Sequence, residues 1–303
     1  MLIEEVKNFR SHYEIEYRGN NKEFDIMGTL LSNSEGLCTF TRDDNFDDIN
    51  MAAEKENISA LFIRKKYADK IKTNATLIFT EKPYYDFHLF HQYLYENTDF
   101  FSLNKPNQIA ESAEIHPSAI IEDHDIIIGE NCKIGPGVVI HANTILGNDI
   151  IIGAGCVIGG ESLHVAYENG KRVFISHVGG VTIGDNTYFG SNNVVVRNLY
   201  KAPPTTIGAN VAIANLVMVG HNVKIEDNVQ IISNVVLGGG CIIKDGARVS
   251  FGSNVANYCV VGEKAWVTIG SVVTRDVPPG QRVSGNFAVP HEKLIQHVKN
   301  ISQ

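Results

Sequence analysis

Aliphatic residues recur at every sixth position through much of this 303-residue chain. One series runs from Ile134 to Ile158, and a longer one runs from Ile207 to Val273. Many of these residues are followed by a glycine, as in "IGAGCV" and "VGHNVK". A six-residue period corresponds to one flat side of a triangular coil, whose inward aliphatic side chain stacks on those of neighbouring coils. The pattern therefore predicts a left-handed parallel β-helix over residues 105–288.

Two segments interrupt this period, at residues 159–180 and 197–206. Insertions in a repeat structure project from one side of it, and that side frequently binds ligands. The repeat ends before residues 289–303, which are predicted to form a short amphipathic C-terminal helix.

The first 104 residues have a different pattern, in which aromatic and charged residues mix without a fixed period. The stretch "NATLIFTEKPYYDFHLFHQYLYE" is typical of a strand, a turn at Pro83 and an amphipathic helix. We therefore expect a separate small α/β domain over residues 1–104.

The composition narrows the function classes. A net charge of −8 argues against nucleic-acid binding, which needs a basic surface to neutralise phosphates. No apolar run is long enough for a membrane span, and the charged N-terminus lacks a signal peptide, so a cytoplasmic location is expected. The cysteines form no CxxC pair, and the histidines lack the close spacing of a zinc site. We expect no metal and no tightly bound cofactor.

Three stretches resemble one enzyme family: "CTFTRDDNF" (38–46), "ENGKRVFISHVGGVTIGDNTYFGSN" (168–192) and "NLVMVGHNVKI" (215–225). Together with the order of the domains, they make the chain similar to the UDP-3-O-acylglucosamine N-acyltransferases of lipid A synthesis. The resemblance implies a nucleotide-binding function for residues 1–104. It also implies a homotrimer with active sites between subunits.

The resemblance assigns the central roles as well. It implies that His221 is the general base and that Phe40 and Phe46 sandwich the base of the nucleotide, with Asp43 contacting its edge. An imidazole suits the first role because its ordinary pKa, about 6.5, lies near working pH. Taken alone, His221 is equally explained as an exposed repeat residue, and the two phenylalanines as core residues.

Further residues are candidates for binding the sugar or the acyl chain: Asn215, Met218, Asn222, His164 and His177. Asn222 either orients the imidazole or caps a turn of the coil. The two loop histidines have the alternative of being merely solvated. For the donor, Lys264, Arg275 and Arg282 are candidates to bind the phosphates of coenzyme A. Each of these three is also explained as an exposed surface charge.

The sequence departs from the family pattern near the proposed base. Ala214 and Met218 occupy the positions of an Asp and a Gln, a second family histidine falls near Asn254, and the tail is short. These departures favour an N-acyltransferase for another amino sugar carried on dTDP or UDP, using acyl-CoA in preference to acyl carrier protein. The alternatives are the lipid A enzyme itself, using acyl carrier protein, and a non-catalytic scaffold.

Overall fold

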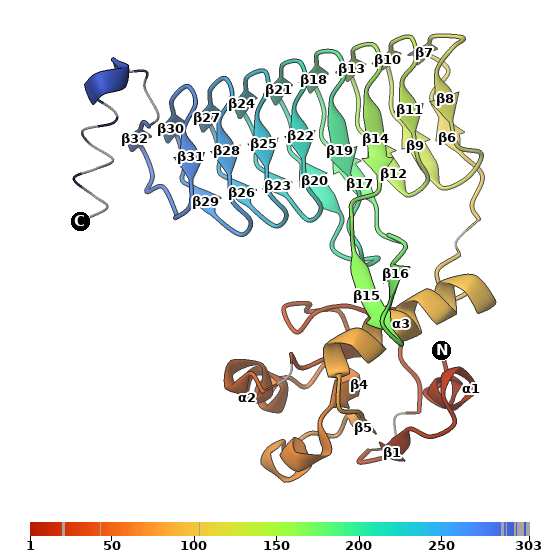
Figure 1. Ribbon diagram of the computed structural model, residues 1–303. Coiled ribbons are helices and arrows are strands. Elements are labelled where there is room, and N and C mark those ends of the chain that lie inside the picture. Colours follow the sequence, from red (N-terminus) through yellow and green to blue (C-terminus); the bar gives the residue numbers. More distant parts are fainter. Residues whose placement is uncertain are drawn as a thin grey trace.

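The computed structural model describes residues 1–19, 22–42, 44–102, 104–285, 288, 290–293, 295 and 300. A small α/β domain is followed by a long parallel β-helix (Figure 1). The predicted fold, a left-handed β-helix behind a small α/β domain, is confirmed. In the predicted C-terminal helix, residues 291–293 are helical, and most of residues 294–303 lie outside the described part of the chain.

The N-terminal domain is built on a five-stranded sheet in the order β1-β5-β4-β3-β2, in which only β1 runs antiparallel to its neighbour. Helix α3 begins with a proline at its first position, where the missing N–H costs no hydrogen bond. This helix contacts β3 and β4 on one side and the β-helix insertion on the other. The elements of the domain are α1 (Glu5–Phe9), β1 (Glu14–Glu16), β2 (Ile26–Met27), β3 (Leu37–Phe40), α2 (Phe46–Glu54), β4 (Ile58–Ile63), the 3₁₀ helix η1 (Lys65–Lys70), β5 (Thr76–Phe79) and α3 (Pro83–Asn97).

The β-helix has three faces, each a parallel sheet that receives one strand from every coil. The first face comprises β7 (Glu114–Ile115), β10 (Lys133–Ile134), β13 (Ile151–Ile152), β18 (Tyr188–Phe189), β21 (Ala212–Ile213), β24 (Gln230–Ile231), β27 (Arg248–Val249), β30 (Trp266–Val267) and β32 (Arg282–Val283). The second face comprises β8 (Ile120–Ile121), β11 (Val139–Ile140), β14 (Val157–Gly160), β19 (Val194–Val196), β22 (Met218–Val219), β25 (Val236–Leu237), β28 (Asn254–Val255) and β31 (Val272–Val273). The third face comprises β6 (Gln108–Ile109), β9 (Ile126–Ile128), β12 (Thr144–Leu146), β17 (Val181–Ile183), β20 (Thr205–Ile207), β23 (Lys224–Ile225), β26 (Ile242–Ile243) and β29 (Val260–Val261).

The core of the β-helix is the ladder of inward aliphatic side chains that the six-residue period predicts. On the third face, Ile207, Ile225, Ile243 and Val261 follow one another in register and are almost completely buried. Each coil buries its aliphatic residues only against the coils on either side, so stability depends on stacking.

The turns between faces require a tight backbone. Most place one residue in the left-handed conformation, and this residue is usually Asn, Asp or Gly, the types that adopt it at least cost. Leu216, Tyr258 and Lys264 are bulkier residues at such positions. Turns are therefore where this fold tolerates strain.

Both insertions leave the coil at the turn from the second face to the third. The first forms an antiparallel hairpin, β15 (Val165–Glu168) and β16 (Lys171–Phe174), which extends to α3 (Figure 1). Ala166, Tyr200 and neighbouring apolar residues enter the core of the N-terminal domain, and Glu168 pairs with Arg10. Instead of forming free binding loops, the insertions attach the N-terminal domain to the β-helix.

Within the described ranges, no helix has the length and apolar character required to cross a bilayer.

Candidate functional site

The candidate site lies on one edge of the β-helix, at the column of turns from the second face to the third, which we call the His221 corner. After the two insertions this column presents His221, Gly239, Asn257 and Arg275, each 18 residues after the last. Because parallel strands lie about 4.7–4.9 Å apart, Arg275 is about 14 Å from His221 along the axis.

The His221 imidazole is held by its neighbours. Its Nδ1 lies 3.1 Å from Oδ1 of Asn222, whose backbone N–H in turn donates to the buried hydroxyl of Thr205 at 2.9 Å. An amide oxygen at this position favours the tautomer with the proton on Nδ1. Asn222 also occupies the left-handed position of the turn. Both interpretations of Asn222 therefore apply: it occupies the turn and orients the imidazole, whose Nε2 forms no hydrogen bond with a described residue.

The free nitrogen lies over Gly239 in the next coil. A Cβ atom at Gly239 would be 2.5 Å from Nε2 and 2.7 Å from Cε1 of His221. The absence of a side chain is thus what allows the imidazole to occupy this position. The N–H of Gly239 makes no hydrogen bond to any described residue. A basic nitrogen and a free backbone donor therefore lie side by side.

Sequence reasoning missed Tyr258, one coil beyond this glycine. Its ring lies against Gly240, where a Cβ would be 2.7 Å from Cδ1 and Cε1. His221 and Tyr258 thus approach Gly239 and Gly240, which we call the glycine platform, from opposite sides. The signal in the sequence was an aromatic residue at a turn position where Asn or Gly is usual.

A cluster of histidines lies behind His221, between the β-helix and α3. The His177 ring is buried, 6.4 Å from the ring of His221. His164 packs instead on His88, with ring centroids 4.5 Å apart. Burial lowers the pKa of His177, His164 and His91 to about 4 each, and that of His88 well below its usual value. Of the two predicted loop histidines, His177 has its ring beside that of His221, whereas His164 packs in the domain interface, where burial and the nearby His221 lower its pKa.

These pKa shifts predict that acid destabilises the contact between the domains. In the unfolded chain the histidines take up protons near pH 6.5, whereas the folded state resists protonation until about pH 4. The unfolded state binds more protons in this window. The contribution of these histidines to the free energy of unfolding is therefore fully present above about pH 6.5 and is lost as the pH drops towards 4. The slope approaches about 1.4 kcal/mol per pH unit for each histidine. Urea unfolding between pH 7.5 and 4.5 measures it.

His91→Leu should flatten that slope because it removes one buried titrating group. It should also lower stability at neutral pH, since His91 Nε2 lies 3.0 Å from the Ser176 carbonyl oxygen. The exposed His116 supplies the control, His116→Leu. If the free energy of unfolding of the two variants changed equally with pH, the assignment of the acid sensitivity to the buried histidines would be contradicted.

A cavity of about 690 Å³ extends from His177 towards the first coils. Its wall includes Glu122, whose Oε1 lies 2.6 Å from Nδ1 of His141, and the half-buried Arg197. Burial opposes ionisation of Glu122, but the Ala142 N–H, His141 and Arg197 outweigh it and lower the pKa of this carboxyl. The space next to His177 is thus lined by charged and polar groups.

The predicted nucleotide-binding residues are not arranged as expected. Phe40 is 7% exposed, and its ring packs on Phe87 and Tyr84 in the domain core. Its burial contradicts the expected sandwich of a base between Phe40 and Phe46. Phe46 is 57% exposed, with the Lys70 ammonium 5.3 Å from its ring centroid. Asp43 lies outside the described residues.

The three cations predicted to bind coenzyme A do not converge. Lys264 lies on the turn from the third face to the first and bonds to Glu263. Arg282, on the first face, stacks on the Trp266 ring at 4.1 Å. Within one chain the three cations therefore lie apart, and of them only Arg275 shares the His221 corner.

The two remaining candidates also lie away from the imidazole. Asn215, on the turn from the first face to the second, accepts a hydrogen bond from the Ser191 N–H at 2.7 Å, so its side chain caps a turn. Met218 points outward on β22 and is 37% exposed. Neither side chain forms a hydrogen bond with His221 among the described residues.

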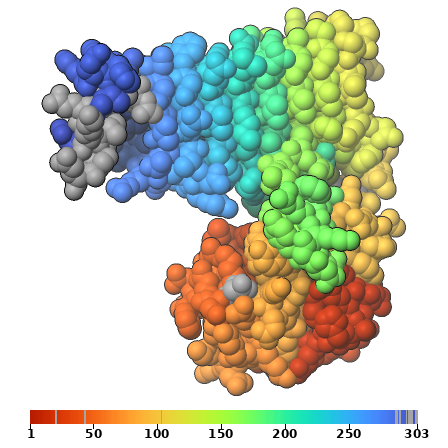
Figure 2. Space-filling view, viewed as in Figure 1, coloured from red at the N-terminus to blue at the C-terminus, as the bar shows by residue number. Residues whose placement is uncertain are grey.

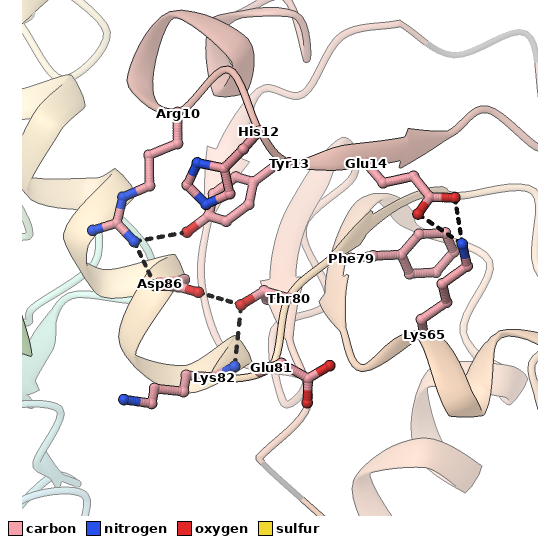
Figure 3. Close-up of a pocket in the computed structure, with 10 residues that line it drawn as sticks. All are labelled: Arg10, His12, Tyr13, Glu14, Lys65, Phe79, Thr80, Glu81, Lys82 and Asp86. Carbon is pink, nitrogen blue, oxygen red and sulfur yellow. Dashed lines mark hydrogen bonds and ion pairs between the residues drawn. The ribbon is translucent and has the colours of Figure 1, made fainter.

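A second cavity, of about 460 Å³, opens in the N-terminal domain between β1, β5 and α3 (Figure 3). Several of its charged groups pair with one another: Arg10 with Asp86, and Glu14 with Lys65. Among the described residues, no group of three or more His, Cys, Asp and Glu side chains is placed to hold a metal ion. The His221 corner, with its free imidazole nitrogen, is the stronger candidate.

The repeat of this chain resembles that of known proteins. Residues 125–160 match the bacterial transferase hexapeptide (six repeats) family. The UDP-3-O-acylglucosamine N-acyltransferase of Helicobacter pylori is 32% identical over 186 residues, 54% of each chain. That of Pseudomonas aeruginosa is 35% identical over 104 residues, 34% of this chain and 24% of the relative.

The chain thus spans about half the length of the Helicobacter pylori relative and about a quarter of the length of the Pseudomonas aeruginosa relative. Among solved structures, the UDP-N-acetylglucosamine acyltransferase of Bacteroides fragilis is 23% identical, with a TM-score of 0.46 over 64% of this chain and 78% of that one. The chain is a hexapeptide-repeat β-helix protein similar to the UDP-3-O-acylglucosamine N-acyltransferases.

Proposed function

We propose that this protein is an N-acyltransferase that moves an acyl group from a thioester to the amine of a nucleotide-linked amino sugar. The observation that carries the proposal is the His221 imidazole, oriented through Asn222 with Nε2 free over Gly239. The relatives named above are acyltransferases for such a sugar, which supports the same reaction class. A scaffold would have no need of an oriented imidazole over a bare glycine.

The geometry suits each step of an acyl transfer. Nε2 of His221 accepts a proton from the attacking amine as the N–C bond forms. The carbonyl oxygen then carries negative charge, which the free N–H of Gly239 is placed to stabilise. Collapse of the intermediate breaks the C–S bond, and the imidazolium returns its proton to the departing thiolate. The products are an amide and a free thiol.

The donor is proposed to approach along the His221 corner from the C-terminal coils. Arg275 lies about 14 Å from His221 by strand spacing, a distance that a phosphopantetheine arm can span. A guanidinium there suits the phosphate at the end of that arm. This arm is common to acyl-CoA and acyl carrier protein, and both are donors to be compared.

Two acceptors deserve comparison. The name of the relatives supports UDP-3-O-acylglucosamine, the lipid A precursor. The polar cavity beside His177 instead favours a sugar without an acyl chain, since Glu122, His141 and Arg197 suit hydroxyl groups better than a hydrocarbon. Amino sugars linked to dTDP and amino sugars linked to UDP both belong in this second class.

The experiment that tests the proposal is a thiol-release assay. Acyl-CoA and acyl carrier protein donors of several chain lengths are combined with UDP-3-O-acylglucosamine and with UDP- and dTDP-linked amino sugars. We expect release that depends on the amine and produces one amide per thiol. Absence of turnover with every pair, together with no nucleotide-sugar binding by calorimetry, would favour a scaffold.

We also propose a homotrimer. Outward apolar residues repeat along the second face, with exposures between 36% and 61%: Ile120, Val194, Met218, Val236 and Val272. An apolar row of this length is typical of a subunit contact. Light scattering should give about three times the chain mass of 33.3 kDa.

Val236→Glu should reduce the mass to that of one chain by placing a charge in this row. Gln230→Glu, on the outward side of the first face, is the control and should remain a trimer. A single-chain mass for the unmodified protein would contradict the proposal.

A further inference from the structure

Tyr258 has a backbone conformation that is unfavourable for an aromatic residue. Its φ of +63° lies in the left-handed region, which is unfavourable for an L-residue and exceptional for bulky side chains. The side chain is 70% exposed, so core packing does not offset this cost. Backbone strain of this kind is found preferentially at functional sites.

The ring also has a defined position. It leans against Gly240, in the coil between its own and that of His221. One coil lies between that of His221 and that of Tyr258, so the two residues are two strand spacings apart, about 10 Å along the axis. The glycine platform lies between the two side chains and carries none of its own.

Tyr258 also faces the N-terminal domain. Desolvation raises the pKa of Tyr84, and the nearby Tyr258 adds to this rise. The pKa of Arg42 is raised chiefly by its hydrogen bond to Asp48, and the nearby Tyr258 raises it further. Figure 2 shows the N-terminal domain and the C-terminal coils separated by an open space, which closes at the hairpin. Tyr258 therefore lies close to residues of the N-terminal domain as well as to the glycine platform.

Resting on the acyl transfer proposed above, we propose that Tyr258 is a specificity-determining residue that packs against the sugar ring of the nucleotide-linked acceptor. The C–H groups of a sugar ring match the flat apolar face of tyrosine. A ring packed there lies over the glycine platform, with its amine towards Nε2 of His221 and its diphosphate towards Arg42. Tyr258 would thus select the amino sugars whose amine reaches the base.

The test uses calorimetric binding of UDP-glucosamine and does not depend on turnover. Tyr258→Gly removes the ring and supplies the residue best suited to the left-handed conformation, so the fold should be retained with an unchanged or higher Tm. Its Kd should rise about 2- to 13-fold, the loss of one aromatic contact. Tyr258→Phe should bind within about twofold of the unmodified protein.

Leu216→Gly is the matched control, because it relieves the same backbone strain on a different corner. We expect it to gain stability in the same way and to bind UDP-glucosamine normally. Equal Kd values for Tyr258→Gly and Leu216→Gly would overturn the inference, as would no binding by the unmodified protein. A smaller assembly by light scattering for Tyr258→Gly would assign the ring to subunit contact and also overturn it. Thiol release by the unmodified protein decides the proposed function separately.

Discussion

His221→Ala should reduce kcat by about 10²–10⁴ while leaving the KM for both substrates nearly unchanged. The expected loss is that of a general base, because no described residue forms a hydrogen bond with Nε2 and Asn222 holds the ring towards the platform. His221 is half-buried on the outside of the aliphatic ladder, so the fold and the assembly should be retained. Steady-state thiol release, with light scattering and thermal unfolding of the same sample, measures both.

Alkaline pH should restore part of the activity of this variant, because a neutral amine needs no base to remove its proton before attack. His116→Ala is the control, since this histidine is exposed in the first coil, on the turn from the first face to the second. If His221→Ala retained activity within about threefold of the unmodified enzyme at neutral pH, the imidazole would only position the acceptor.

The β-helix was accessible from sequence because its signal is local and repeated. Each inward residue between Ile207 and Val273 obeys the same period, and burial of all of them follows from one rule. The small domain was predicted in outline by the strand and helix near Pro83. The role of the insertions was not, because an apolar residue such as Ala166 or Tyr200 does not specify which surface it will pack against.

The site was predicted where one residue carries the chemistry and missed where several must meet. His221 and Asn222 are adjacent in sequence, so their contact required no knowledge of the fold. Phe40 has the right residue type for stacking, but strand β3 directs its ring into the core. Lys264 and Arg282 are basic and close in sequence to Arg275, and yet the coil carries them to other faces.

Gly239→Ala should reduce kcat by about 100-fold or more without unfolding the protein. The three atoms nearest to an added Cβ all belong to the His221 imidazole, with Nε2 at 2.5 Å, so the methyl group displaces the ring from the platform. A displacement of about 1 Å at a reacting group can cost about 10²-fold in rate. Gly239 is outside the left-handed region, so alanine fits its backbone. Steady-state kinetics beside circular dichroism measures the effect.

Gly285→Ala is the control, because an added Cβ there meets no atom within 4 Å. The double variant His221→Ala/Gly239→Ala identifies how the methyl group acts. If it acts by moving the imidazole, the double variant should be no slower than His221→Ala alone, since the ring it displaces is already gone. A double variant many-fold slower than His221→Ala would show that the methyl group obstructs the substrate itself. The bare platform would then serve to admit the thioester, and the position of the imidazole over it would be a consequence of that opening.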